Sequence, residues 1–263
     1  MQFGYTRQAY YQKKQRLVKL HMKEQLLLKE IRQIRQKQPR IGGRKLYKEL
    51  KAIMISIGLH LGRDRFFDFL RANGLLIERR RKYVHTTDSR HHLRTYRNII
   101  KDKELTAPNQ VYVADITYIR TLQGFCYLSL LTDAYSRKIV GYNVSRSLSI
   151  EGSLVALKMA INSGNLTGLI HHSDRGVQYC SYEYTKLLRK NNICISMTEQ
   201  NHVYENALAE RVNGILKEEF LLGEILQSYE IARKMVRQAV NIYNYERPHM
   251  SINYDKPAQR HAA

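Results

Sequence analysis

The sequence lacks the features that mark membrane, secreted and disulfide-rich proteins. It has no run of eighteen apolar residues, so no transmembrane helix is expected. The opening residues, MQFGYTRQAYYQKK, contain no apolar segment of the kind that a secretory signal needs. Cys126, Cys180 and Cys194 are too few and too scattered for a disulfide framework, and they form no C-x-x-C metal pair. We therefore expect a protein of a reducing cytoplasm.

Acidic residues are also scarce relative to basic ones. The 263 residues include 44 Lys and Arg against 23 Asp and Glu, a net charge of +21. Such an excess favours a polyanionic partner, most often nucleic acid, over plain solubility. Residues 1–107 carry 27 basic and 9 acidic residues, whereas residues 108–263 carry 17 and 14. This asymmetry predicts one part that holds a phosphate backbone and one compact catalytic or scaffold domain.

The basic part is predicted to be helical. Apolar residues at helical spacing indicate a basic amphipathic helix over 14–37, within an N-terminal segment 1–38. Shorter helices are expected over 44–54 and 63–72, joined by a glycine-containing turn. This pattern in a basic segment is typical of a helix-turn-helix, here over 39–78, although a generic helical hairpin is the alternative. The candidate DNA contacts on its second helix are Arg63, Arg65 and Arg71.

Residues 79–107 are polar and basic, and we expect a linker that tracks along DNA. Residues 108–263 alternate β-rich runs with helical segments after an opening group of three strands. The strands are expected over 111–120, 125–136, 138–147, 167–174 and 193–198, and the helices over 149–163, 182–192, 206–222 and 228–245. This order predicts an α/β domain with a mixed sheet, opened by an antiparallel meander and flanked by helices.

Three acids stand out in the second domain. Asp115 lies in the middle of the first predicted strand and Asp174 at the end of the fourth, where a carboxylate is costly unless it is paired or bound to metal. Glu210 lies on a helix that follows a polar loop. Asn213 and Lys217 follow Glu210 at three and seven residues, on the same helix face. This face is expected to hold a metal ion and to touch DNA phosphates.

Three carboxylates without a matching histidine or cysteine set favour Mg²⁺, with Mn²⁺ as the alternative. Two such ions would clamp the attacking and leaving oxygens of a phosphodiester displacement. Asp133 is a competing acid, but its place after a strand is better explained by a turn. His171 and His172 have no second pair at zinc-binding spacing, and we expect them to pack inside the domain.

Sequence motifs surround these acids and continue to the end of the chain. They are ADITYI around Asp115, LTDAYSRKIVGY, HHSDRGVQY around Asp174, ENALAERVNGILKEE around Glu210 and YNYERPHMSINYDKPAQR. Thirty-five residues lie between Asp174 and Glu210. Together the motifs resemble the DDE transposases of the insertion-sequence-three family, within the retroviral-integrase superfamily. The stretch PRIGGRKLYKEL…GLLIERRRKY similarly resembles that family's helix-turn-helix.

The resemblance implies an RNase H-like fold with Asp115, Asp174 and Glu210 as the catalytic and metal-binding set. It implies cutting at the ends of an insertion element and joining to double-stranded target DNA, by a homo-oligomer at the bacterial nucleoid. Lys217 matches the family's basic position. The family's full enzyme is often a frameshift fusion with an additional N-terminal helix-turn-helix and a leucine zipper, which this sequence lacks. We therefore expect the second-frame product, with the upstream-frame product as a partner.

Two other functions fit the same residues. A catalytically silent derivative would bind element ends and regulate a full-length enzyme. An RNase H-like nuclease would instead cut RNA–DNA hybrids, although the predicted helix-turn-helix favours duplex DNA.

Overall fold

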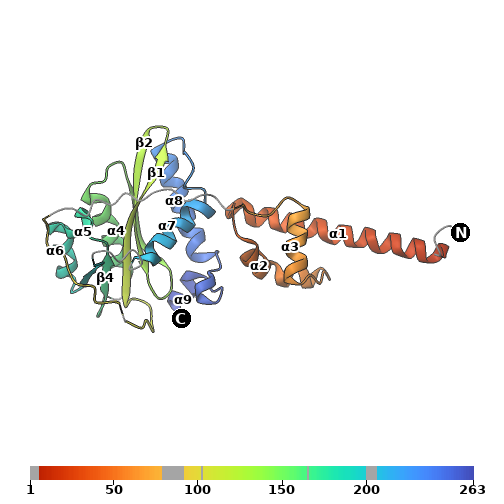
Figure 1. The fold of residues 1–263 in the computed structure, drawn as a ribbon, viewed down its shortest axis with the longest axis horizontal. Coiled ribbons are helices and arrows are strands. Elements are labelled where there is room, and N and C mark those ends of the chain that lie inside the picture. Colours follow the sequence, from red (N-terminus) through yellow and green to blue (C-terminus); the bar gives the residue numbers. More distant parts are fainter. Residues whose placement is uncertain (1–5, 79–91, 102, 165, 200–205) are drawn as a thin grey trace. The chain divides into compact units, whose positions relative to one another are not determined.

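The computed structural model describes residues 6–78, 92–101, 103–164, 166–199 and 206–263. The chain divides into two compact units, residues 1–79 and 80–263. We call them the N-terminal unit and the C-terminal unit, and each is described by itself (Figure 1). None of the described helices is long and apolar enough to cross a membrane.

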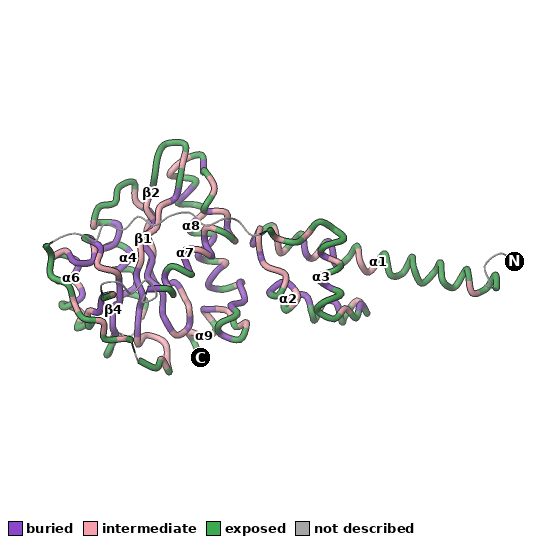
Figure 2. The backbone as a smooth tube through the Cα atoms, viewed as in Figure 1, coloured by how far each residue is buried: buried purple, intermediate pink, exposed green. Residues whose placement is uncertain are grey.

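The N-terminal unit consists of helices, as the sequence predicts. They are α1 (Arg7–Lys37), α2 (Gly43–Ser56) and α3 (Arg63–Ala72). The start of α1 is earlier than expected because the Thr6 side chain caps it by accepting a hydrogen bond from the Ala9 amide at 3.2 Å. The apolar core joins only the second half of α1 to α2 and α3, and the first half is largely exposed (Figure 2).

The C-terminal unit is built on a five-stranded mixed sheet, which confirms the predicted α/β class. The order is β3-β2-β1-β4-β5. β1 pairs with β2 and β2 with β3 in antiparallel fashion, whereas β4 is parallel to both β1 and β5. The strands are β1 (Val111–Thr121), β2 (Gly124–Asp133), β3 (Ile139–Ser145), β4 (Ile170–Ser173) and β5 (Cys194–Met197).

Helices cover both faces of this sheet. One apolar cluster joins the sheet to α7 (Ala207–Glu219) and α8 (Tyr229–Tyr245), and a second joins its other face to α4 (Ile150–Ser163) and α6 (Tyr182–Lys190). The central strand β1 is therefore buried on both sides over its first four residues (Figure 2). Three short elements were not predicted from the sequence: α5 (Val177–Cys180), η1 (Met250–Ile252) and α9 (Pro257–Ala262).

The predicted linker over 79–107 needs correction in its second part. Residues 79–91 and 102 lie outside the described residues. The remainder packs on the C-terminal unit: Ile100 and Leu105 join an apolar cluster there, and the Ile99 amide donates to Ser196 Oγ at 3.1 Å. The Arg189 guanidinium also donates to the Tyr96 hydroxyl. Apolar side chains spaced along a polar segment were enough to attach it to the domain.

A buried ion pair fixes the end of α7. The Arg247 guanidinium makes two hydrogen bonds to the Glu219 carboxylate, at 2.8 and 3.0 Å, and the Arg247 side chain is only 4% exposed. By contrast, Arg146 and Glu230 form an exposed pair. The buried pair ties the segment after α8 to the helix that carries Glu210.

We expect Glu219→Gln to lower the free energy of unfolding by about 3 kcal/mol, because it leaves a buried guanidinium without its counter-charge. The control is Glu230→Gln, which removes the exposed pair with Arg146 and should leave the denaturation midpoint unchanged. Urea denaturation of the three proteins checks this. Equal midpoints for the two variants would contradict it.

Candidate active site

Asp115 lies in the centre of the sheet, opposite Leu130 of β2. Its side chain is turned toward α7: the Asn213 Nδ2 donates to Asp115 Oδ2 at 2.7 Å. The Ile116 amide donates to the other oxygen, Oδ1, at 2.9 Å. These two bonds orient a half-buried carboxylate.

Asp174 follows directly after β4, the parallel neighbour of β1. In this pairing Val113 lies opposite His172, so Asp115 and Asp174 each come two residues beyond the same register pair. Side chains two residues apart on a strand share a face, and neighbouring strands are about 4.8 Å apart. The register therefore brings the two aspartates side by side. The Gly176 amide donates to Asp174 Oδ1 at 3.0 Å, which shapes the turn that follows.

Glu210 lies in the first turn of α7 and is exposed. The preceding residue, Ala209, packs into the apolar cluster around Val111 and Val113 and anchors this turn on the sheet. The helix thus brings a third carboxylate from a distant part of the sequence to the part of β1 that carries Asp115.

The three acids influence one another electrostatically. Burial and the negative charge of Asp174 raise the pKa of Asp115 to about 7, with a smaller contribution from Glu210. The hydrogen bonds from Asn213 and Ile116 act in the opposite direction. A carboxylate that resists ionisation beside two others is typical of a site that a cation would complete.

The donor set fits a hard cation, because all three side chains offer carboxylate oxygens. Among the described residues, no group of three His, Cys, Asp or Glu side chains already converges as metal ligands do.

Asn213 and Lys217, which were predicted to share a face of α7 with Glu210, have different surroundings. Asn213 was expected among the DNA contacts, but it is 6% exposed and its amide donates to Asp115, so it is directed into the site. Lys217 is half-buried, with its Nζ 4.1 Å from the centre of the Tyr118 ring. Burial lowers the pKa of Lys217, while the charge of Asp115 opposes that shift.

Asp133 has a structural role, as the sequence predicts. Its buried carboxylate accepts hydrogen bonds from the Asn109 amide at 2.8 Å and from the amide and hydroxyl of Ser136 at 2.7 and 2.6 Å. Burial alone would raise the pKa of Asp133, but hydrogen bonds from His261, Ser136 and Asn109 outweigh it and hold this pKa below its usual value. These contacts form the turn between β2 and β3.

The paired histidines pack inside the domain, as expected. His171 Nε2 lies 2.9 Å from the Tyr184 hydroxyl, and burial together with the neighbouring His172 lowers the pKa of His171 to about 3. His172 Nδ1 lies 2.9 Å from Ser196 Oγ on β5. Both side chains connect the strands to their neighbours.

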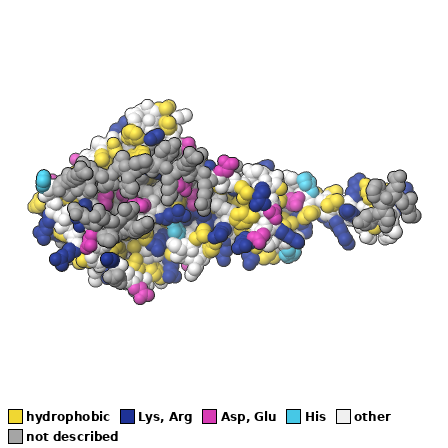
Figure 3. All heavy atoms as spheres, viewed as in Figure 1, with side chains coloured by type: hydrophobic (Ala, Val, Ile, Leu, Met, Phe, Trp, Pro, Cys, Tyr) yellow, Lys and Arg dark blue, Asp and Glu magenta, His cyan; other side chains and the backbone are white. Residues whose placement is uncertain are grey.

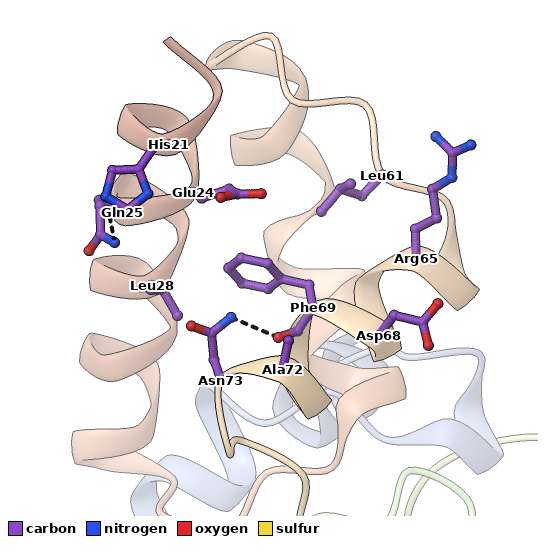
Figure 4. Close-up of a pocket in the computed structure, with 10 residues that line it drawn as sticks. All are labelled: His21, Glu24, Gln25, Leu28, Leu61, Arg65, Asp68, Phe69, Ala72 and Asn73. Atoms are coloured by element: carbon purple, nitrogen blue, oxygen red, sulfur yellow. Dashed lines mark hydrogen bonds between the residues drawn. The ribbon is translucent and has the colours of Figure 1, made fainter. Parts of the chain in front are cut away.

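The predicted DNA-contacting arginines of the N-terminal unit are all exposed on α3. Arg63 pairs with Asp64 at 2.8 Å and Arg71 with Asp68 at 2.5 Å. Arg65 borders a groove between α1 and α3, into which Phe69 points while the Arg65 side chain extends away from it (Figure 4). Lys and Arg are distributed over the visible face of this unit (Figure 3).

Sequence reasoning missed the residues beyond Asp115 on the β1–β2 hairpin. Tyr118 supports Lys217, and Arg120 lies near the ring of Phe125. The available signal was the strand alternation, which places Tyr118 and Arg120 on one face of β1. It gave no reason to associate either residue with α7.

The C-terminal unit resembles a known protein domain. Models of the integrase core domain match residues 106–202 and 191–257. A chain of the simian T-cell lymphotropic virus intasome, solved by cryo-electron microscopy with the PP2A regulatory subunit B56 gamma, shares the fold. Its TM-score is 0.51 at 18% identity, over 84% of this chain and 75% of that one. The C-terminal unit therefore has the RNase H-like fold of integrase cores.

Sequence relatives define the family more closely. The uncharacterized 31 kDa protein of insertion element IS600 from Shigella sonnei is 35% identical over 80% of this chain and 79% of its own length. Transposase InsF for insertion sequence IS3A of Escherichia coli K12 is 34% identical over 68% of this chain and 64% of its own length. The chain belongs to the DDE transposases of insertion sequences, and the resemblance to the insertion-sequence-three family is confirmed.

The raised pKa of Asp115 predicts an unusual effect on stability. An aspartate has a pKa near 3.9 when unfolded, so the cation-free protein should lose stability as the pH rises from about 4 to about 7. Asp115→Asn removes the charge and should raise the free energy of unfolding at about pH 8 by about 1–3 kcal/mol, measured with a chelator present.

The matched control is Asp133→Asn on the adjacent strand. Because the pKa of Asp133 is held low, its charged form stabilises the fold and this variant should be less stable than the wild type at the same pH. A destabilised Asp115→Asn protein would show that the carboxylate cluster carries no electrostatic strain.

Proposed function

We propose that this transposase cleaves phosphodiester bonds at the ends of its insertion element and transfers the freed strand ends to target DNA. The observation that carries the proposal is the parallel register that places Asp115 beside Asp174, with Glu210 close enough to affect the pKa of Asp115. The insertion-sequence relatives support the same reaction class.

Asp115, Asp174 and Glu210 would hold Mg²⁺, with Mn²⁺ as a substitute, through their carboxylate oxygens. When bound, such ions would supply charge stabilisation at the attacking and leaving oxygens. Asn213 keeps the Asp115 carboxylate directed toward the site through its 2.7 Å hydrogen bond and is a positioning residue. Lys217, two helical turns after Glu210, contributes a positive charge for a DNA phosphate.

The N-terminal unit would bind duplex DNA, with residues 39–78 as the helix-turn-helix and Arg63, Arg65 and Arg71 as its contacts. Support comes from the exposure of all three arginines on α3 and from the charge of residues 1–79, which hold 19 basic and 6 acidic residues. Pairing two element ends implies a homo-oligomer on the bacterial nucleoid. An upstream-frame product is a further proposed partner.

The activity test uses labelled duplexes that span the ends of the element, with Mg²⁺ supplied or chelated. Glu210→Gln should reduce nicking and joining on the order of 10³-fold, because it removes several kcal/mol of transition-state stabilisation. Glu218→Gln, an exposed glutamate on the same helix, is the matched control and should retain activity.

The outcomes separate the competing functions. Metal-dependent strand cleavage that Glu210→Gln abolishes supports the transposase. Duplex binding without any cleavage would instead favour the catalytically silent regulator. Cleavage restricted to RNA–DNA hybrids would favour the RNase H-like nuclease.

The DNA-binding proposal predicts the behaviour of Arg65→Ala. Loss of one phosphate contact should make the plot of log affinity against log salt concentration less steep, by about 1 in the magnitude of its negative slope, for any duplex sequence. Fluorescence anisotropy titrations at several salt concentrations measure this slope. Lys190→Ala, which removes an exposed charge from the C-terminal unit, should leave it unchanged. An unaltered slope for Arg65→Ala would show that Arg65 does not contact a DNA phosphate.

A further inference from the structure

The strands β1 and β2 form a hairpin (Figure 1). The far half of this hairpin carries aromatic and basic residues on one face. Tyr118 lies opposite Tyr127, and Arg120 lies opposite Phe125. Directly paired residues point to the same side of an antiparallel ladder, as do residues two apart on one strand. We call Tyr118, Arg120, Phe125 and the adjoining Lys217 the hairpin platform.

The side chains of the platform form a continuous row of contacts between aromatic rings and cations. Lys217 Nζ lies 4.1 Å from the centre of the Tyr118 ring, and this ring meets Phe125 edge-on at 5.6 Å between centroids. Arg120 Cζ is 6.0 Å from the centre of the Phe125 ring. Phe125 nevertheless remains 54% exposed, so these contacts leave much of its ring available to a ligand.

Backbone hydrogen bonds hold the platform in place. The Leu226 amide donates to the Arg120 carbonyl at 2.9 Å, and the Leu122 amide donates to the Leu226 carbonyl at 2.9 Å. The loop after α7 thereby pairs with the hairpin on both sides of Thr121. The Gly223 amide also donates to the Lys217 carbonyl, at 3.1 Å. Such support lets an exposed ring act as a fixed surface.

The platform begins close to the proposed catalytic acids. Along β1, Tyr118 is three residues from Asp115, a rise of about 10 Å, and Arg120 is about 17 Å away. Strand alternation directs both side chains to the face opposite that of Asp115, and Lys217 reaches the Tyr118 ring from α7, the helix that carries Glu210. Lys217 follows Glu210 by two helical turns, also about 10 Å. These distances correspond to about three to five nucleotides of a DNA strand at 3.4 Å each.

We propose that the hairpin platform stacks an unpaired DNA base a few nucleotides from the reacting phosphodiester. Exposed aromatic rings stack on bases of any sequence, and the flanking Lys217 and Arg120 match the charge of the neighbouring phosphates. Bases within a paired duplex already stack on each other, so the ligand is a single-stranded end or a flipped nucleotide. The proposal rests on the proposed function for the identity of the substrate.

The chain contains no tryptophan, which allows a direct test of stacking. Phe125→Trp places a single indole on the platform, and Tyr182→Trp places one at a matched site on α6. Tyr182 is 68% exposed and has Lys186 Nζ 5.5 Å from its ring centre. The probe is a short duplex with an unpaired 3′ segment, in a normal and an abasic form, added to the full chain without metal.

We expect the normal probe to quench the indole emission of the Phe125→Trp protein and the abasic probe to leave it nearly unchanged. Neither probe should quench the emission of the Tyr182→Trp protein. Equal effects of the two probes on the Phe125→Trp protein would overturn the proposal. Because no cleavage is measured, the result is independent of the Glu210→Gln assay. If the normal probe quenches the emission but the wild type cleaves no DNA, base stacking on the hairpin platform is supported and the proposed cleavage activity is contradicted.

Affinity provides a second measurement without a new fluorophore. Phe125→Ala should weaken binding of the unpaired probe about tenfold and leave binding of a fully paired duplex unchanged. Tyr182→Ala should change neither affinity. Circular dichroism of each variant verifies folding, which the exposure of both side chains favours. An equal loss for paired and unpaired probes would contradict base stacking.

Discussion

The parallel pairing of β1 with β4 is the constraint on which the candidate site depends. The register pair Val113–His172 places Asp115 and Asp174 at the same height on neighbouring strands. Their repulsion and the burial of Asp115 raise its pKa to about 7. The cation-free fold therefore carries an electrostatic cost at neutral pH, and the same cost creates affinity for a divalent ion.

Helix α7 connects the parts of this arrangement. One turn of it contributes Glu210, the next contributes the Asn213 bond to Asp115, and Lys217 reaches the hairpin platform. The end of the helix is fixed by the buried pair of Glu219 with Arg247. A segment far from the acids in the sequence thus keeps the helix in position, because an unpaired guanidinium there would be costly.

Local sequence patterns were sufficient for most of the secondary structure. The helix over Arg63–Ala72 was predicted at its observed bounds, and the three-stranded meander followed from runs of β-branched and aromatic residues. The candidate acids were recognisable because Asp115 interrupts an apolar strand, where an unpaired carboxylate is unfavourable. These inferences use neighbours in the chain, so no knowledge of distant contacts was needed.

The tertiary structure decided what depends on pairing between distant segments. The sequence by itself determined the class of the domain and its acids, but only the β1–β4 register set Asp115 beside Asp174. Helix periodicity placed Asn213 on the face of Glu210, yet packing turned its amide inward. The hairpin platform arises from cross-strand and helix–strand contacts. Such contacts follow from the burial of whole surfaces, which no local pattern specifies.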